Sequence, residues 1–292
     1  MSYEPKDHIF LYNGYALGAG GRVEVNDKPL FLNTPASVLS ITGGGEARSR
    51  SENVRFGKKP FFRTRRPHFF MHIGMVETEA IGGEVGDNYV TTTRSVVRGL
   101  NVNNVLTADL VVGQTKSIHR KSGRYENGDE PSVIVEEPST IEGLKIHGRP
   151  VKLTKDRILP NLHTFRDLNN AVSGLESSAL NGYEATSWRK AFRKQNLMDP
   201  DDTQPPYVRD LANASLMARN VVRCSIFDSV KADGCDNHGY SVEVPEFGRI
   251  FFGELFVNEG MKRLSMIRID LGCTFCGSAN VGQNGTNGET FP

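Results

Sequence analysis

The 292-residue chain lacks any apolar run that approaches the length of a transmembrane helix. Its first thirty residues lack a basic start followed by an apolar stretch, so no secretory signal is visible. We therefore expect no membrane span, and either a cytoplasmic protein or one exported without a recognisable N-terminal signal. Lys and Arg together (35) nearly balance Asp and Glu (34), and this argues against a wholly basic nucleic-acid binder.

Sequence motifs for common catalytic sites are also missing. There is no Gly-x-Ser-x-Gly, no P-loop and no His-Glu-x-x-His. The segment Gly18–Gly21 lacks the third glycine and the following helix of a dinucleotide site. The sequence therefore assigns no catalytic residue, and it favours a non-enzymatic protein over an enzyme.

One eight-residue pattern occurs twice, at Ser95–Val102 and at Ser139–Ile146. In each copy the apolar positions change strand parity at a glycine, Gly99 or Gly143. A β-bulge at that glycine would insert one backbone unit and restore a single buried face. Glycine suits this position because a bulge often needs a positive φ.

Each copy of the pattern leads into a turn and a second apolar run. Asn103-Asn104 is a credible two-residue hairpin loop, because asparagine tolerates the left-handed region. The residues His147–Pro150 occupy the corresponding place after the second copy. The repeat therefore predicts two related β-hairpins.

The fold class that follows is mainly β: an antiparallel sandwich or roll built from bulged hairpins, in one domain over residues 1–292. Abundant glycine (30 residues) suits a fold with many corners. The apolar run Ile250–Val257 predicts a central strand, and the Gly-, Asn- and Thr-rich tail Gly277–Pro292 is expected at the surface. A cap at Thr164 and apolar residues at helical spacing predict a helical insertion over residues 160–220.

Residues 47–67 are strongly basic, with a single acid, Glu52, and we expect an exposed basic loop. Phe56, Phe61 and Phe62 interrupt the basic residues, a combination that suits phosphate contact and base stacking. A solvated loop, or an arm that docks on a neighbouring subunit, fits the same composition. The candidate interaction residues are Arg48, Arg50, Arg55, Lys58, Lys59, Arg63, Arg65 and Arg66.

Cys273 and Cys276 stand two residues apart, a spacing that can hold a metal ion or close a small disulfide. Cys235 and His238 supply a second pair of ligands at a compatible spacing, so zinc is one interpretation. Reduced thiols or a structural disulfide is the other, and we assign no metal site or cofactor. A redox site would need the pair at a helix start, whereas here it precedes Gly277.

Three blocks give the chain a resemblance to a known group. Leu106–Val112, Ser139–Val151 and Asn258-Glu259 ahead of Leu264–Leu271 resemble the block order of bacterial choice-of-anchor P proteins and of related uncharacterised bacterial β-rich proteins. The resemblance covers mainly residues 89–154 and 220–288. It implies a strand-rich module without catalytic residues, located on the cell surface in the anchored proteins. This chain departs from them in having no visible signal or anchor.

These observations lead us to expect a non-enzymatic structural or interaction protein of bacterial type that self-assembles, with protein partners that include itself. Two alternatives stay open. One is an enzyme whose site lies between the helical insertion and the sheet, where concave sites commonly form. The other is a nucleic-acid binder that uses the basic loop.

Overall fold

The computed structural model describes residues 9–25, 28–59, 68–121, 132–135, 138–156, 222–257, 262–272 and 275–291. Within these ranges every regular element is a β-strand, which confirms the mainly β fold class. None of the described segments forms a helix long and apolar enough to cross a membrane. The helical insertion predicted at 160–220 lies outside the described residues.

The strands form two antiparallel sheets of nine strands each. Sheet A has the order β14-β15-β16-β17-β18-β1-β2, with β12 beside β16 and β3 beside β1. Its strands are β1 (Ile9–Val25), β2 (Lys28–Asn33), β3 (Ala36–Val38), β12 (Val222–Ser225), β14 (Asp236–His238), β15 (Ser241–Val244), β16 (Gly248–Val257), β17 (Lys262–Gly272) and β18 (Phe275–Phe291).

Sheet B has the order β13-β11-β10-β7-β6-β5-β4, with β8 and β9 both beside β7. Its strands are β4 (Gly45–Lys59), β5 (His68–Val85), β6 (Asn88–Val102), β7 (Leu106–Arg120), β8 (Ser132–Val135), β9 (Thr140–Glu142), β10 (Lys145–Ile146), β11 (Arg149–Lys155) and β13 (Phe227–Ala232).

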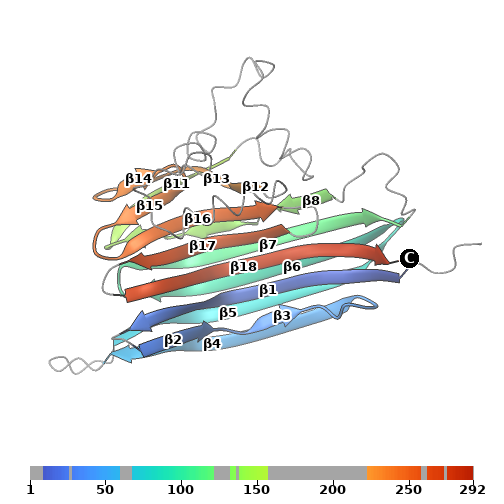
Figure 1. Cartoon of the computed structure of the whole chain (residues 1–292), viewed down its shortest axis with the longest axis horizontal. Helices are drawn as coiled ribbons and strands as arrows, with labels where there is room; N and C mark the ends of the chain where they lie inside the picture. Colours follow the sequence, from blue (N-terminus) through green and yellow to red (C-terminus); the bar gives the residue numbers. More distant parts are fainter. Residues whose placement is uncertain are drawn as a thin grey trace, which may run out of the picture.

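The two sheets pack face to face, with β1 and β18 of sheet A over β5, β6 and β7 of sheet B (Figure 1). Hydrogen bonds join the layers: the Asn284 Nδ2 donates to Ser95 Oγ at 2.8 Å, and the Ser37 Oγ donates to the Thr78 carbonyl at 3.0 Å. The sheets approach closely, since a Cβ added at Gly113 would lie 2.4 Å from Asn284 Nδ2. A continuous apolar core fills much of the space between them.

The predicted change of buried face at the two repeat glycines is present. Gly99 and Gly143 have φ of 64° and 62°, and Val97 and Leu100 on either side of Gly99 are both buried. Asn103 and Asn104 both have positive φ, as predicted, but Val102 pairs with Leu106, so the hairpin loop has three residues, Asn103 to Val105, rather than two. The two copies of the eight-residue pattern pair with opposite sides of β7. Both Gly99 and Gly143 therefore lie level with Asp109.

The expected insertion of one residue into a single strand is wrong. The pairing of β6 with β7 keeps one register on both sides of Gly99, and so does the pairing of β5 with β6. The reason is that every long strand of sheet B changes face at the same level. The positions involved form the kink row of sheet B: Asn53, Gly74, Gly99, Asp109 and Gly143.

Sheet A has a matching kink row at Gly253, Met266, Gly282 and Gly18. The regular pairing skips each of these positions and resumes in the same register beyond it. On β16, for example, Phe252 and Leu255 both belong to the apolar core between the sheets although they differ in strand parity. The kink is therefore a property of whole sheets.

The kink rows divide the interior into two halves of different chemistry. On β6 and β7, the buried residues on one side of the row are apolar: Leu100, Val102, Leu106 and Ala108. On the other side they are mostly polar, and β17 and β18 add to this polar half, whose members include Thr91, Thr93, Ser95, Thr115, Ser117, His119, Lys262, Asn284 and Thr286.

The expectation that the tail Gly277–Pro292 lies at the surface is wrong for residues 279–286, whereas Gly277 and Ser278 are exposed. These residues belong to β18, which pairs with β1 on one side and β17 on the other. Ala279, Val281 and Asn284 are completely buried. Glycine-rich sequence was misread as a loop because its strand role depends on contact with distant neighbours, such as the ring of Tyr15 over Gly285. The predicted central strand at Ile250–Val257 is confirmed within β16.

Candidate functional site

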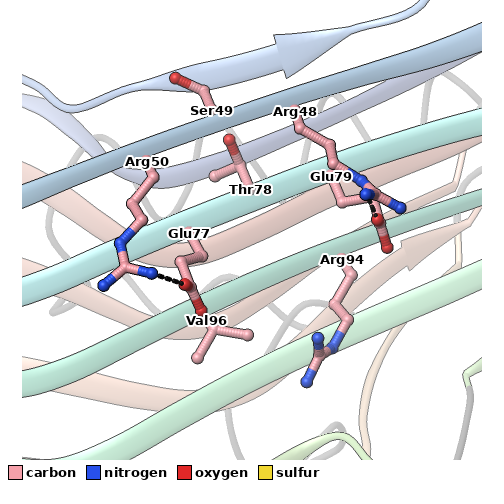
Figure 2. Close-up of a pocket in the computed structure, with 8 residues that line it drawn as sticks. All are labelled: Arg48, Ser49, Arg50, Glu77, Thr78, Glu79, Arg94 and Val96. Atoms are coloured by element: carbon pink, nitrogen blue, oxygen red, sulfur yellow. Dashed lines mark hydrogen bonds and ion pairs between the residues drawn. The ribbon is translucent and has the colours of Figure 1, made fainter.

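An open groove of about 540 Å³ lies on sheet B where β4, β5 and β6 run side by side (Figure 2). Glu77 and Glu79 alternate along β5 with the buried Thr78 and Ala80, so the two glutamates project from the outer face. The groove is lined by Arg48, Ser49, Arg50, Glu77, Thr78, Glu79, Arg94 and Val96.

Antiparallel pairing builds a ladder of opposite charges along this groove. Arg48 stands opposite Glu79, and its Nε lies 2.6 Å from Glu79 Oε1. Arg50 stands opposite Glu77, and Nη1 of Arg50 lies 3.0 Å from Glu77 Oε1. Each arginine also contacts a glutamate of its own strand, Arg48 with Glu46 and Arg50 with Glu52 at 2.7 Å. The hydrogen bond to Glu52, followed by the charge of Glu77, raises the pKa of Arg50.

Arg94 extends the ladder from β6. Arg94 pairs with Glu79 across β5 and β6, while Arg48 pairs with Glu79 across β4 and β5, so Glu79 lies between the two arginines. Arg94 is exposed and makes no ion pair with any residue in the described part of the chain, and no dashed line reaches it in Figure 2. The groove therefore offers one guanidinium group to a carboxylate supplied from outside.

Of the predicted interaction residues, only Arg48 and Arg50 lie in this groove. Arg55 lies elsewhere on β4, with its guanidinium carbon 5.2 Å from the ring centre of Phe69. Lys58 and Lys59 belong to the end of β4, where their backbones pair with Phe69 and His68. Arg63, Arg65 and Arg66 lie outside the described residues.

The prediction of an exposed basic loop over residues 47–67 is wrong for residues 47–59, which belong to β4. The charged side chains alternate with Ala47, Ser49 and Ser51, and this alternation is a strand pattern without large apolar residues. Such a pattern suits an edge strand, because small side chains face the neighbouring layer and charges face solvent. Arg94 was missed because its place in the groove depends on the pairing of β5 with β6.

The cysteine residues do not assemble a metal site in the described part of the chain. No three His, Cys, Asp or Glu side chains come together there as metal ligands, while Cys273 lies outside the described residues. Strands β15, β16 and β17 separate Cys276 on β18 from His238 on β14. Cys276 is free and exposed.

The thiols of Cys224 and Cys235, which pack in or against the apolar core, are poor nucleophiles. Burial raises the pKa of Cys224, and the charges of Asp156 and Glu254 raise it further. Burial also raises the pKa of Cys235, with a smaller contribution from Asp236. Because the thiolate is the reactive form, neither residue is set up for covalent chemistry.

A second cluster of charges lies on the outer face of sheet A. Arg268 donates two hydrogen bonds to Glu254, at 2.7 and 3.2 Å, and also contacts Asp270. Its guanidinium carbon lies 3.7 Å from the ring centre of Phe251. Burial opposes the charge of Arg268, but the carboxylates of Glu254 and Asp270 outweigh it and raise the pKa. An arginine bonded to two neighbouring carboxylates fits an internal structural role.

Comparison with known proteins adds one finding. The family model described as Domain of unknown function (DUF8256) matches residues 10–258. No curated protein and no solved structure matches the chain.

Proposed function

The chain belongs to the family described as Domain of unknown function (DUF8256), and we propose that it is a non-enzymatic structural or interaction protein. Its proposed scaffold is an antiparallel sandwich of kinked hairpins. The proposed contact surface is the groove of β4, β5 and β6, which binds another protein. The chemistry of the groove supports this role, because its lining carries guanidinium and carboxylate groups and neither histidine nor cysteine.

The observation that carries the proposal is Arg94. It stands at the end of a ladder in which the other two arginines already have glutamate partners. A protein partner would complete the ladder if it carried an acidic side chain for Arg94 and basic side chains beside it for Glu77 and Glu79. Such contacts act mainly on partner choice and association rate, so binding should weaken as salt is added.

The nucleic-acid alternative finds less support in the groove. Arg48 and Arg50 each contact two glutamates, and Glu46, Glu52, Glu77 and Glu79 outnumber the three arginines. A phosphate chain would meet these carboxylates along with the arginines. The enzyme alternative places its site beside residues 160–220, which lie outside the described residues.

The proposal is tested by site-specific photo-crosslinking in cells that produce the protein. A benzoylphenylalanine in place of Arg48, which lines the groove and is exposed, should give discrete protein adducts, and the same group at Lys152, exposed on β11, should not. Arg94→Glu should abolish these adducts. With the identified partner in pure form, Arg94→Glu should weaken binding roughly tenfold or more at low salt. Adducts that form equally at Lys152, or persist in Arg94→Glu, would contradict the proposal.

A further inference from the structure

The edge of sheet A consists of two strands that lie end to end along β1. β2 pairs with residues 20–25 of β1, and β3 pairs with residues 15–17. In the described part of the chain, neither strand has a partner on its other side. β4, the edge of sheet B, lies on the same side of the molecule (Figure 1). Both sheets therefore end together there.

The β2–β3 edge, defined here as residues 28–42, is apolar and almost free of charge. Between Lys28 and Glu46 the sequence contains no Asp, Glu, Lys or Arg. Phe31, Val38 and Ile41 are 66%, 64% and 66% exposed. Exposed apolar side chains on a strand with open backbone groups are the usual template for strand addition.

The adjacent edge of sheet B is built in the opposite way. Glu46, Arg48, Arg50 and Glu52 place a charge at every second position of β4. Charged edge strands resist pairing with other strands. One edge of the molecule is thus protected by charge and the other is not, although the two lie side by side.

We propose that the β2–β3 edge binds the same edge of a second copy of this chain, around a two-fold axis. An edge whose only charged residue is Lys28 cannot select an oppositely charged partner, and it meets little repulsion from an identical edge. The net charge of +1 adds little repulsion between copies. Backbone hydrogen bonds and the three apolar side chains would supply the affinity. The inference rests on the proposed function only in treating the chain as an interaction protein, since the groove takes no part.

Sedimentation velocity of the full chain tests this inference over a range of concentrations. We expect a concentration-dependent dimer that persists in high salt. Val38→Lys and, separately, Ile41→Lys should raise its dissociation constant roughly tenfold or more. The matched control is Val85→Lys, since Val85 is a strand valine with 63% exposure that lies at the β5–β6 hairpin. Circular dichroism confirms that each variant is folded.

Each outcome separates the inference from the proposed function. A dimer that is lost in both edge variants, and kept in Val85→Lys and Arg94→Glu, supports pairing through β2 and β3. A dimer that is kept in both edge variants but lost in Arg94→Glu overturns the inference and supports the groove as the contact surface. A wild-type chain that stays monomeric at about 100 µM overturns the inference as well, while partner binding at the groove is judged by crosslinking.

Discussion

At the scale of single residues, the interior holds a histidine in an unusual setting. His119 is buried in the polar half, with its ring centre 5.0 Å from that of Phe10. Burial, followed by the positive charge of Lys262, lowers the pKa of His119 to about 4. The folded protein therefore keeps this imidazole neutral at a pH where the unfolded chain protonates it.

Stability should consequently fall as the pH is lowered. The unfolded chain takes up the proton near its ordinary pKa of 6.5, whereas the folded protein does so only near 4. The contribution is fully present above about pH 6.5 and is lost on the way to pH 4, in total on the order of 3 kcal/mol. Urea unfolding at several pH values should show a smaller loss in His119→Gln than in the wild type. His147→Gln, at an exposed turn, should follow the wild type; equal losses in all three would contradict the prediction.

Only some residues of the candidate site could be predicted from the sequence. Arg48 and Arg50 could be predicted as interaction residues from the basic composition of their segment, and both lie in the groove. Their glutamate partners and Arg94 are brought to them by antiparallel pairing of β4, β5 and β6, and no local pattern encodes that register. Charge density alone indicated a loop, because the strand β4 contains almost no apolar residue to mark it.

At the scale of elements, the kink of each strand depends on backbone conformation. Gly99 has φ of 64°, and a Cβ at this position would meet no atom closer than 3.5 Å. The obstacle to a larger residue is therefore the strain of the left-handed region rather than lack of space.

Gly99→Ala should destabilise the protein by about 1–2 kcal/mol, the cost of a left-handed conformation for an L-residue. Gly83→Ala is the matched control on β5, since Gly83 has no positive φ and no atom within 4 Å of an added Cβ. It should change the free energy of unfolding by less than about 0.5 kcal/mol. Chemical denaturation measures both, and equal effects would show that the conformation at Gly99 is not strained.

Much of the strand architecture was predictable at this scale. The parity change at Gly99 and Gly143 and the positive φ of Asn103 and Asn104 follow from local chemistry, and all are present, although the loop is one residue longer than predicted. The alignment of the kinks across whole sheets could not be predicted, because at Asp109 and Met266 no glycine marks the row. The strand β18 could not be predicted for a similar reason, since its small residues are required by side chains from distant parts of the chain that pack on them.

At the scale of the whole molecule, the polar half of the interior shows how buried hydroxyl groups contribute to stability. The hydroxyls of Thr93 and Thr115 share a hydrogen bond of 2.9 Å. The hydroxyl of Thr91, one pair of residues away on the same face, is buried without a hydrogen-bond partner in the described structure. A buried hydroxyl stabilises the fold only when it is bonded.

Replacement of these threonines by valine should therefore have opposite effects. Thr93→Val leaves the Thr115 hydroxyl unsatisfied and should cost about 1–3 kcal/mol. Thr91→Val removes an unsatisfied group at almost constant volume, and should be neutral or stabilising. Thermal and urea unfolding of the two variants compare them directly. A larger loss in Thr91→Val than in Thr93→Val would mean that the hydrogen bonding of this half differs from that described.

The aligned kinks also restrict where residues can be inserted into or deleted from the chain. Deleting one codon from the middle of β6 would turn half of that strand inside out, exposing Leu100 and Val102 or burying Arg94 and Arg98. Because the neighbouring strands stay in step, no local adjustment could absorb the deletion. Insertions and deletions within the family should accordingly gather at hairpin tips such as Gly86-Asp87, while the spacing between each kink and its strand ends stays constant.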